Sequence, residues 1–359
     1  MTPTTRADAP TRTERFGLAM AEVMNHAGLA LMLSIGHRTG LLDAMAALPP
    51  ATSRGVADAA GLDERYVREW LGAMVAGGVV ELDPDAGLYK LPEEHAAWLT
   101  RSTSLSNVAA SAQWIAVLAG VEDLVTEAFR HGRGVPYSAY PRFHEVMAEE
   151  SQQSVVGALV GHILPLAPGL AARLEAGIDV LDVGCGSGRA LLLLAETFPA
   201  SRFVGLDFSG EAIARARAEA EGRGLANVRF EARDVSGPIG REAFDLATAF
   251  DAIHDQARPA EVLRRVFEAL RPGGLFLMQD ISGRGGHHDD ASHPFGTFLY
   301  AVSCMHCMSV SLAQGGPGLG AMWGRDLARS MLRDAGFAEV DVRESPHDPL
   351  NFYYLAPRA

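Results

Sequence analysis

A glycine-rich loop and three aspartates are the residues of this chain whose types and spacing point most directly to chemistry. The loop runs from Asp182 to Gly188, with glycine at Gly184 and Gly186 as well, and it follows a short apolar strand, Ile178 to Val183. A strand that turns into a helix exposes backbone N–H groups, and glycine lets a ligand approach the main chain there. We therefore expect a ligand at this loop.

Each of the three aspartates follows a predicted strand. Asp182 ends the strand before the loop, Asp207 ends Arg202–Leu206, and Asp234 follows Val228–Ala232. The carboxyl ends of parallel strands share one edge of a sheet, so these side chains should line one crevice. Asp207 lies about twenty residues beyond the loop, where an acidic residue in such folds binds ribose hydroxyls. Asp234 can accept from an exocyclic amine, so the set suits an adenosine without phosphates, its zwitterionic end facing the loop and Asp182.

The glycine-rich loop matches neither of two sequence patterns that bind phosphates. The dinucleotide fingerprint needs glycine at its sixth position, where this chain has Arg189, and a Walker loop needs Gly-Lys-Ser/Thr after it. A nicotinamide-dependent oxidoreductase is therefore disfavoured.

The elements that must position these residues alternate strand and helix from Gly177 onward. The remaining predicted elements are helices Arg189–Phe198, Gly210–Gly222, Arg258–Leu270 and Trp323–Ala335, strands Ala243–Phe250 and Leu275–Asp280, and a closing hairpin of Ala338–Arg343 and Leu350–Ala356. This alternation predicts an α/β domain with a parallel sheet and right-handed crossovers.

The N-terminal part has the form of a winged helix-turn-helix, mostly helical. A helix over Arg15–Ile35 and a second near Gly36–Ala47 precede two short capped helices, Ser53–Ala60 and Glu64–Gly77, and two strands, Val79–Leu82 and Leu88–Leu91. The charges on the recognition-helix position nearly cancel, and the wing is acidic. A protein that binds in a DNA groove should be basic at these positions, so a scaffold or dimerisation role is favoured over DNA binding.

At this point the chain resembles class I S-adenosylmethionine-dependent methyltransferases. The resemblance rests on Val180–Gly188, Asp207, Asp234, the strand Phe244–Phe250 and the run Leu270–Gly274, and it covers about residues 166–359. It implies a Rossmann-like, seven-stranded methyltransferase sheet whose closing hairpin supplies the antiparallel strand. The N-terminal part resembles, more loosely, the winged-helix dimerisation domain of small-molecule O-methyltransferases, which implies a homodimer.

Carried over by position, the resemblance assigns cofactor roles to particular residues. Gly184, Gly186 and Gly188 would approach the methionine and ribose, and Asp207 would bind the ribose with Phe208 against the adenine. Asp234 and Val235 would bind the adenine edge, while Phe250 and Asp251 would lie by the methionine. The implied cofactor is S-adenosyl-L-methionine, with S-adenosyl-L-homocysteine as product.

His254 is the candidate base for the methyl acceptor. It lies just beyond the fourth strand, on the edge where the sulfonium should sit, and Asp251 and Asp255 could orient it. An acceptor hydroxyl often needs a base, for which histidine is the usual side chain. The alternative is a polar residue that merely begins a helix.

The acceptor pocket is expected to involve two further segments. Tyr137 and Tyr140 lie on a loop before the glycine-rich core, where they either border a pocket or simply pack. Met305 and His306 lie in an apolar helix, which we expect to cover an apolar or aromatic acceptor. Cys304 and Cys307, with His306 between them, are residue types that bind metals, but the stretch is apolar and the sequence has no second cysteine pair. We therefore expect no metal site here.

Bulk composition limits the remaining possibilities. The net charge of −13 argues against nucleic acid as a partner, and an odd count of 3 cysteines fits a reducing cytoplasm. We find no signal segment and no uninterrupted apolar stretch that spans a bilayer, so no membrane association is expected.

We therefore predict a cytoplasmic methyltransferase that modifies a hydroxyl of a small molecule. The domain scheme is a disordered tail (1–14), a winged-helix dimerisation domain (15–100), a helical connector contributing to the active site (101–165) and a methyltransferase domain (166–359). The alternative from another class is a winged-helix transcriptional regulator that uses the methyltransferase fold to sense S-adenosylmethionine.

Overall fold

The computed structural model describes residues 9–102 and 107–359 and divides into two compact units, Met1–Ala116 and Val117–Ala359. The predicted connector, 101–165, is therefore shared between the two units. Most of the predicted tail lies outside the described residues, but its last part begins the first helix at Arg12, capped by Thr11.

The first unit is mostly helical with a small hairpin. Its elements are α1 (Arg12–Thr39), α2 (Leu41–Ala47), α3 (Ser53–Ala60), α4 (Glu64–Ala76), β1 (Glu81–Asp83), β2 (Leu88–Lys90), α5 (Glu93–Leu99) and α6 (Val108–Ser111). Thr52 and Asp63 cap α3 and α4, as the sequence predicts, and Gly61 joins the two helices with a φ of 68°. The buried core of this unit includes Leu42 and Leu71.

Helix α1 exposes much of its apolar surface in this unit. Its exposed large hydrophobic residues are Phe16, Leu18, Met20, Val23, Met24, Leu31 and Ile35. By length and apolar composition alone, α1 and the stretch Gly296–Ala313 could each cross a membrane, and two bent helix pairs would raise the number to 4 if each pair were one span. The sequence expectation rested instead on uninterrupted apolar runs, and in α1 Glu22, Asn25 and His26 interrupt the run.

The second unit begins with irregular helices. They are α7 (Gln113–Ala119, which starts before the boundary), α8 (Glu122–His131), η1 (Tyr137–Ala139), α9 (Phe143–Ser151), η2 (Gln152–Val156), η3 (Leu159–Ile163), η4 (Leu164–Leu166) and α10 (Leu170–Ala176). Segments η2 and η3 are π-helical, a form that often occurs at functional sites.

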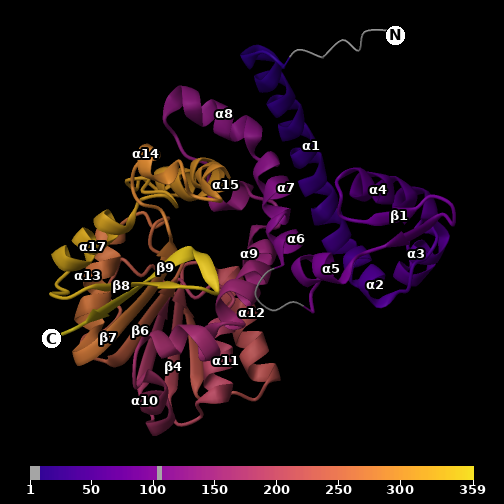
Figure 1. The fold of residues 1–359 in the computed structure, drawn as a ribbon. Coiled ribbons are helices and arrows are strands. Elements are labelled where there is room, and N and C mark those ends of the chain that lie inside the picture. The colour runs from indigo at the N-terminus through magenta and orange to yellow at the C-terminus, as the bar shows by residue number, and fades with distance from the viewer. Residues whose placement is uncertain (1–8, 103–106) are drawn as a thin grey trace, which may run out of the picture. The chain divides into compact units, whose positions relative to one another are not determined.

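A seven-stranded sheet forms the centre of the second unit (Figure 1). Its strands are β3 (Asp179–Val183), β4 (Arg202–Asp207), β5 (Val228–Ala232), β6 (Phe244–Phe250), β7 (Leu270–Ile281), β8 (Asp341–Ser345) and β9 (Asp348–Pro357). The order is β5-β4-β3-β6-β7-β9-β8, in which β9 is antiparallel to both neighbours and the other pairs are parallel. The sheet confirms the predicted α/β class.

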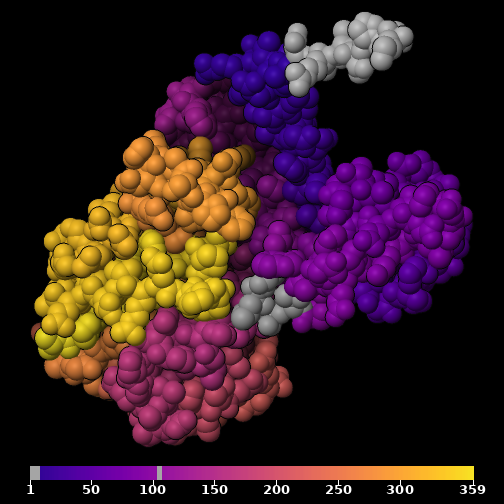
Figure 2. Space-filling model, viewed as in Figure 1, coloured from indigo at the N-terminus to yellow at the C-terminus, as the bar shows by residue number. Residues whose placement is uncertain are grey.

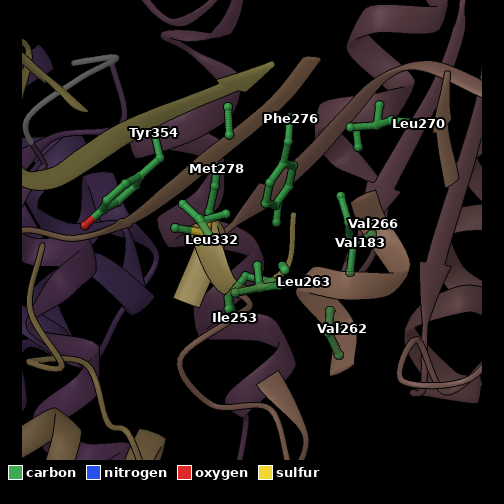
Figure 3. Packing of buried hydrophobic residues seen from close by; sticks show 14 of the residues in the cluster. Val183, Ile253, Val262, Leu263, Val266, Leu270, Phe276, Met278, Leu332 and Tyr354 are labelled. Atoms are coloured by element: carbon green, nitrogen blue, oxygen red, sulfur yellow. The ribbon is translucent and has the colours of Figure 1, made fainter. Parts of the chain in front are cut away.

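Helices connect and cover the strands. They are α11 (Arg189–Thr197), α12 (Gly210–Gly222), α13 (Pro259–Ala269) and α17 (Arg325–Asp334). Phe276 and Met278 of β7 are buried with Leu263 of α13 and Leu332 of α17, and Figure 3 shows these side chains converging. Burying one such side chain contributes about 1.5–3 kcal/mol. This core fixes the strand ends that carry the site.

The segment between β7 and α17 is also helical. It contains α14 (His287–Asp290), α15 (Gly296–Val302), η5 (Ser303–Cys307) and α16 (Met308–Ala313). In Figure 2 this orange segment meets the yellow C-terminal residues on one face of the unit. Just before the segment, the Ser282 hydroxyl donates to the Pro349 carbonyl over 3.0 Å.

Candidate active site

The glycine loop between β3 and α11 has a left-handed backbone at each predicted glycine. The φ angles are 73° at Gly184, 52° at Gly186 and 73° at Gly188. A Cβ at Gly184 would lie 2.5 Å from Ala252, and one at Gly188 would lie 2.4 Å from Phe230, whereas one at Gly186 would meet nothing within 4 Å. The first and third glycines therefore allow close packing, and Gly186 faces open space.

That open space belongs to a cavity of about 240 Å³ at the carboxyl edge of the sheet. The predicted residues that line it are Tyr137, Asp182, Gly184, Gly186, Asp207, Phe208, Val235, Phe250, Asp251 and Asp255. The predicted residues absent from its lining are Tyr140, Gly188, Asp234, His254, Met305 and His306. The lining residues not singled out from the sequence include Phe143, His144, Met147 and Arg189.

Asp207 joins the glycine loop to the end of β4. Its carboxylate accepts hydrogen bonds from the backbone N–H of Gly186, at 2.9 Å, and of Ser209, at 2.8 Å. Burial raises the pKa of Asp207, although these two hydrogen bonds oppose the shift. Its oxygens retain lone pairs for a ligand hydroxyl on the cavity side.

Asp182 is more deeply placed. It is 2% exposed, and its carboxylate accepts a hydrogen bond from the Thr248 hydroxyl over 2.7 Å. Burial raises the pKa of Asp182 to about 7, while the Thr248 hydrogen bond lowers it. The side chain therefore links β3 to β6 at the base of the cavity.

Asp234 lies outside the cavity lining, on the surface. Its carboxylate accepts from Arg258 over 2.7 Å and from the Ser236 hydroxyl over 2.6 Å. These contacts, Ser236 first, lower the pKa of Asp234. Val235, next in the chain, is buried and does line the cavity. At the third strand end the structure thus presents an apolar wall, with the carboxylate turned toward an arginine.

His254 is held by Asp280 rather than by Asp251 or Asp255. His254 Nδ1 lies 2.7 Å from Asp280 Oδ1, and Trp323 donates to the same oxygen over 3.0 Å. Asp280 can reach His254 because β7 runs beside β6, so their ends are neighbours in space. Burial lowers the pKa of His254, but Asp280 and Cys307 outweigh it and hold that pKa well above its ordinary value.

The other two aspartates have their own partners. The Tyr137 hydroxyl donates to Asp255, and burial raises the pKa of Asp255 to about 6. Gln279 donates to Asp251 over 3.3 Å, and Asp251 has a φ of 49°, which is uncommon for a residue with a Cβ. Both carboxyl groups line the cavity and flank the buried His254 in the chain.

An aromatic cluster of Tyr137, Tyr140, Phe143 and His306 lies beside these carboxyl groups. The ring of His306 stacks on Phe143 at 4.4 Å and meets the edges of Tyr140 at 4.7 Å and Tyr137 at 5.4 Å. Burial lowers the pKa of His306 to about 3, so this imidazole is neutral. Tyr140 donates to the Met305 carbonyl over 2.5 Å, which ties the loop to helix η5.

No metal site adjoins this cluster in the described part of the chain. Among those residues, no group of three or more histidine, cysteine or acidic side chains could hold a metal ion. Cys185, Cys304 and Cys307 are all free thiols.

Two family models match separate parts of the chain. Residues 27–101 match an Rv2258c-like winged HTH domain, and residues 174–314 match a methyltransferase domain. The chain has the fold of human N-acetylserotonin methyltransferase, solved with S-adenosylmethionine, at a TM-score of 0.69 and 18% identity over 99% of this chain and 100% of that one.

The chain therefore carries a methyltransferase domain with the class I fold.

Curated relatives within this group match to different extents. The trans-aconitate 2-methyltransferase of Deinococcus radiodurans is 37% identical over 115 residues, which span 32% of this chain and 41% of that protein. The erythromycin 3''-O-methyltransferase of Saccharopolyspora erythraea is 28% identical over 259 residues, 66% of this chain and 81% of that protein. The first match thus covers less than half of the relative's length.

The methyltransferase cavity fits the cofactor in its polar and apolar parts. Asp207 offers acceptors for a ribose, Gly186 leaves room against the backbone, and Val235 offers an apolar surface for a base. Sequence reasoning missed Asp280 and Trp323. A signal was present for Asp280, since it ends a predicted strand as Asp182 and Asp207 do.

Proposed function

We propose that this methyltransferase transfers the methyl group of S-adenosyl-L-methionine to a hydroxyl of a small apolar or aromatic molecule. The observation that carries the proposal is His254, held by Asp280 next to a cavity lined by Gly186 and Asp207. When bound, the cofactor supplies an electrophilic methyl group on a sulfonium. The erythromycin-modifying relative, whose name specifies an O-methyl transfer, supports oxygen as the acceptor atom.

Different cavity residues would contact different parts of the cofactor. Asp207 would accept from the ribose hydroxyls, Phe208 and Val235 would flank the adenine, and Gly184 and Gly186 would face the methionine end with Asp182 beneath them. Phe250 and Asp251 would lie beside that end. For Asp234 we keep only an outer role near the adenine, because Arg258 already occupies its carboxylate.

His254 would take the proton of the acceptor hydroxyl. A carboxylate only accepts hydrogen bonds, so Asp280 fixes the proton of neutral His254 on Nδ1 and leaves Nε2 as the basic nitrogen. His254 is 3% exposed, so the acceptor reaches it only when the aromatic cluster shifts. Tyr137, Tyr140, Met305 and His306 would then contact the acceptor, with Asp255 controlling Tyr137.

The test separates catalysis from cofactor binding. His254→Ala should lower methyl transfer to a responsive member of a panel of phenols and aromatic acids by about 100-fold or more, because a general base contributes that much. S-adenosylhomocysteine release measures the transfer, and calorimetry should show unchanged cofactor affinity. Full activity in the variant would remove His254 as the base.

A DNA-binding regulator is the weaker candidate. On α4, Arg65 pairs with Glu69 at 2.5 Å and Arg68 with Glu64 at 3.5 Å, so the arginines are matched by acids on the same helix. Phosphate binding needs unpaired positive charge. Salt-dependent retardation of duplex DNA by the full chain would revive this role.

We also propose a cytoplasmic homodimer that forms through α1. Helix α1 exposes an apolar surface that includes Phe16, Val23 and Met24, and the described residues of its own unit do not cover this surface. Such patches mark interaction sites, and a second copy would cover both surfaces at once. Phe16→Asp with Met24→Asp should halve the mass seen by light scattering. A wild-type mass that is already monomeric would refute the dimer.

A further inference from the structure

Two of the three cysteines lie on one turn of helix and are not used by the proposed methyl transfer. Cys304 and Cys307 both belong to the π-helical segment η5. Residues three apart on a helix have Cα atoms roughly 5–6 Å apart, which is within the range a disulfide spans. Both are free thiols. The pair can therefore exist as a dithiol or as a disulfide with modest local adjustment.

Cys307 contacts the candidate base. It is 6% exposed, and its thiol is near enough to His254 to help raise the pKa of that imidazole, whose Nδ1 lies 2.7 Å from Asp280. The Ser311 hydroxyl, four residues beyond Cys307, donates to the Gln256 carbonyl over 2.9 Å, so the helical segment packs against the residues around His254. Thiol, imidazole and carboxylate thus follow one another in the order that activates cysteine nucleophiles, in which the imidazole takes the thiol proton. His254 then faces two duties, toward an acceptor hydroxyl and toward Cys307.

Cys304 is placed differently. It lines a second cavity of about 480 Å³ with Tyr300, Ser303 and Met322, and it is only partly buried. Burial raises the pKa of Cys304, so at neutral pH this thiol stays protonated and reacts slowly with oxidants. It is nevertheless one helical turn from Cys307, the position of a resolving thiol.

We propose that Cys307 is an oxidation site for small hydroperoxides, activated by His254 and resolved by Cys304, and that its oxidation switches off methyl transfer. The switching part rests on the proposed role of His254 as the base; the oxidation chemistry does not.

The chemistry balances with a hydroperoxide as the oxidant. Cys307 gives its proton to His254, and its sulfur takes the terminal oxygen of the hydroperoxide. The O–O bond breaks, and the alcohol or water leaves with the proton from His254. The Cys304 sulfur then attacks the Cys307 sulfenic acid, the S–O bond breaks, and the departing hydroxide takes the Cys304 proton as water. Two thiols are oxidised to a disulfide and one hydroperoxide is reduced.

Oxidation should inactivate because drawing Cys307 toward Cys304 distorts the helix that carries His306, whose ring stacks on Phe143 in the aromatic cluster proposed to contact the acceptor. A thiol reductant should restore the dithiol and the activity, since the disulfide is the lower, reversible step of cysteine oxidation.

The experiment treats the full chain with hydrogen peroxide and maps its peptides. The peptide containing both cysteines should lose the mass of two hydrogens and regain it with dithiothreitol, whereas oxidation of the adjacent Met305 adds oxygen and is not reversed. Methyl transfer should fall at least tenfold in parallel and recover. Cys185→Ser should still form the disulfide.

Three variants separate the steps. Cys304→Ser should keep basal methyl transfer and trap a sulfenic acid at Cys307 that dimedone labels. Adding His254→Ala should slow that labelling at least tenfold, and in Cys307→Ser the labelling of Cys304 should be slow. Equal labelling in all three, or an unchanged peptide mass under peroxide, overturns the oxidation site. A disulfide that leaves methyl transfer unchanged overturns the switch, and absence of any methyl transfer before oxidation counts against the proposed function alone.

Discussion

Replacing Asp280 with asparagine tests how His254 is held. Asp280 is fully buried, and its Oδ1 accepts from His254 at 2.7 Å, from Trp323 at 3.0 Å and from the backbone N–H of Ile281 at 2.9 Å. Asparagine keeps the shape and an acceptor oxygen but removes the charge. Any change in the behaviour of His254 therefore reports the ion pair rather than lost packing.

The size of the effect follows from burial. Two unit charges about 4 Å apart attract by about 4 kcal/mol at an effective dielectric constant of 20, and removing one partner of a buried pair costs about 3–5 kcal/mol. The pKa of His254 is raised in the folded chain, so its pairing adds stability fully below the unfolded-state pKa of about 6.5 and loses that contribution as pH rises through the folded-state pKa.

Urea unfolding at several pH values measures this contribution without a methyl acceptor. The wild type should exceed Asp280→Asn by about 3–5 kcal/mol near pH 5, and the gap should narrow steadily toward high pH. Asp290→Asn is a matched control, since Asp290 is also buried, at 2% exposed, but binds Tyr300 and the Arg284 N–H. The loss of unfolding free energy caused by Asp290→Asn should not change across the pH range in which His254 titrates.

Methyl transfer gives an independent check. With the charge gone and burial unchanged, the pKa of His254 falls, so the rising limb of kcat against pH should move to lower pH. The plateau should drop by about 10²–10⁴, because an amide can favour the wrong imidazole tautomer. A stability gap that does not change with pH, together with an unmoved limb, would refute the buried ion pair.

The other predictions concern the cavity and its loop. Asp207→Asn should weaken S-adenosylmethionine binding about 10- to 100-fold by calorimetry, because hydrogen bonds to a charged group contribute about 1.5–3 kcal/mol; wild-type affinity would contradict the ribose role. The folded-state pKa of Asp182 is raised from 3.8 to about 7, so its ionisation lowers stability as pH rises between these values, and Asp182→Asn should flatten that part of the urea-unfolding profile. Gly188→Ala should cost about 1–3 kcal/mol in thermal unfolding, since φ is 73° and a Cβ would lie 2.4 Å from Phe230, whereas Gly222→Ala, on an open helix face, should cost nothing.

The parts of the site that could be predicted from sequence are those set by local geometry. Glycine at positions 184, 186 and 188 predicts a loop with positive φ angles, because glycine tolerates that conformation, and the structure has them. An aspartate at the end of a buried strand must lie at the edge of the sheet. Asp207 therefore lines the cavity as predicted. Such features need no knowledge of distant contacts.

The parts that escaped depend on contacts across the chain. His254 and Asp280 are separated by 26 positions and meet only because β6 and β7 pair in register. Asp234 pairs with Arg258, which is 24 positions away, so the sequence around its own strand gives no sign of this contact. The strand expected over Leu275–Asp280 begins at Leu270, because Phe244 of β6 pairs with Leu270. In each case a neighbour that is remote in sequence decides.

The antiparallel strand β9 has a consequence for synthesis on the ribosome. It is inserted between β7 and β8 but follows both in the chain, and it carries the fully buried Tyr353. At about 5–20 residues per second, β7 waits for seconds with an open, apolar edge before β9 is made. Such an edge invites pairing with another chain. The nascent methyltransferase should therefore need a chaperone most in the interval just before its hairpin emerges.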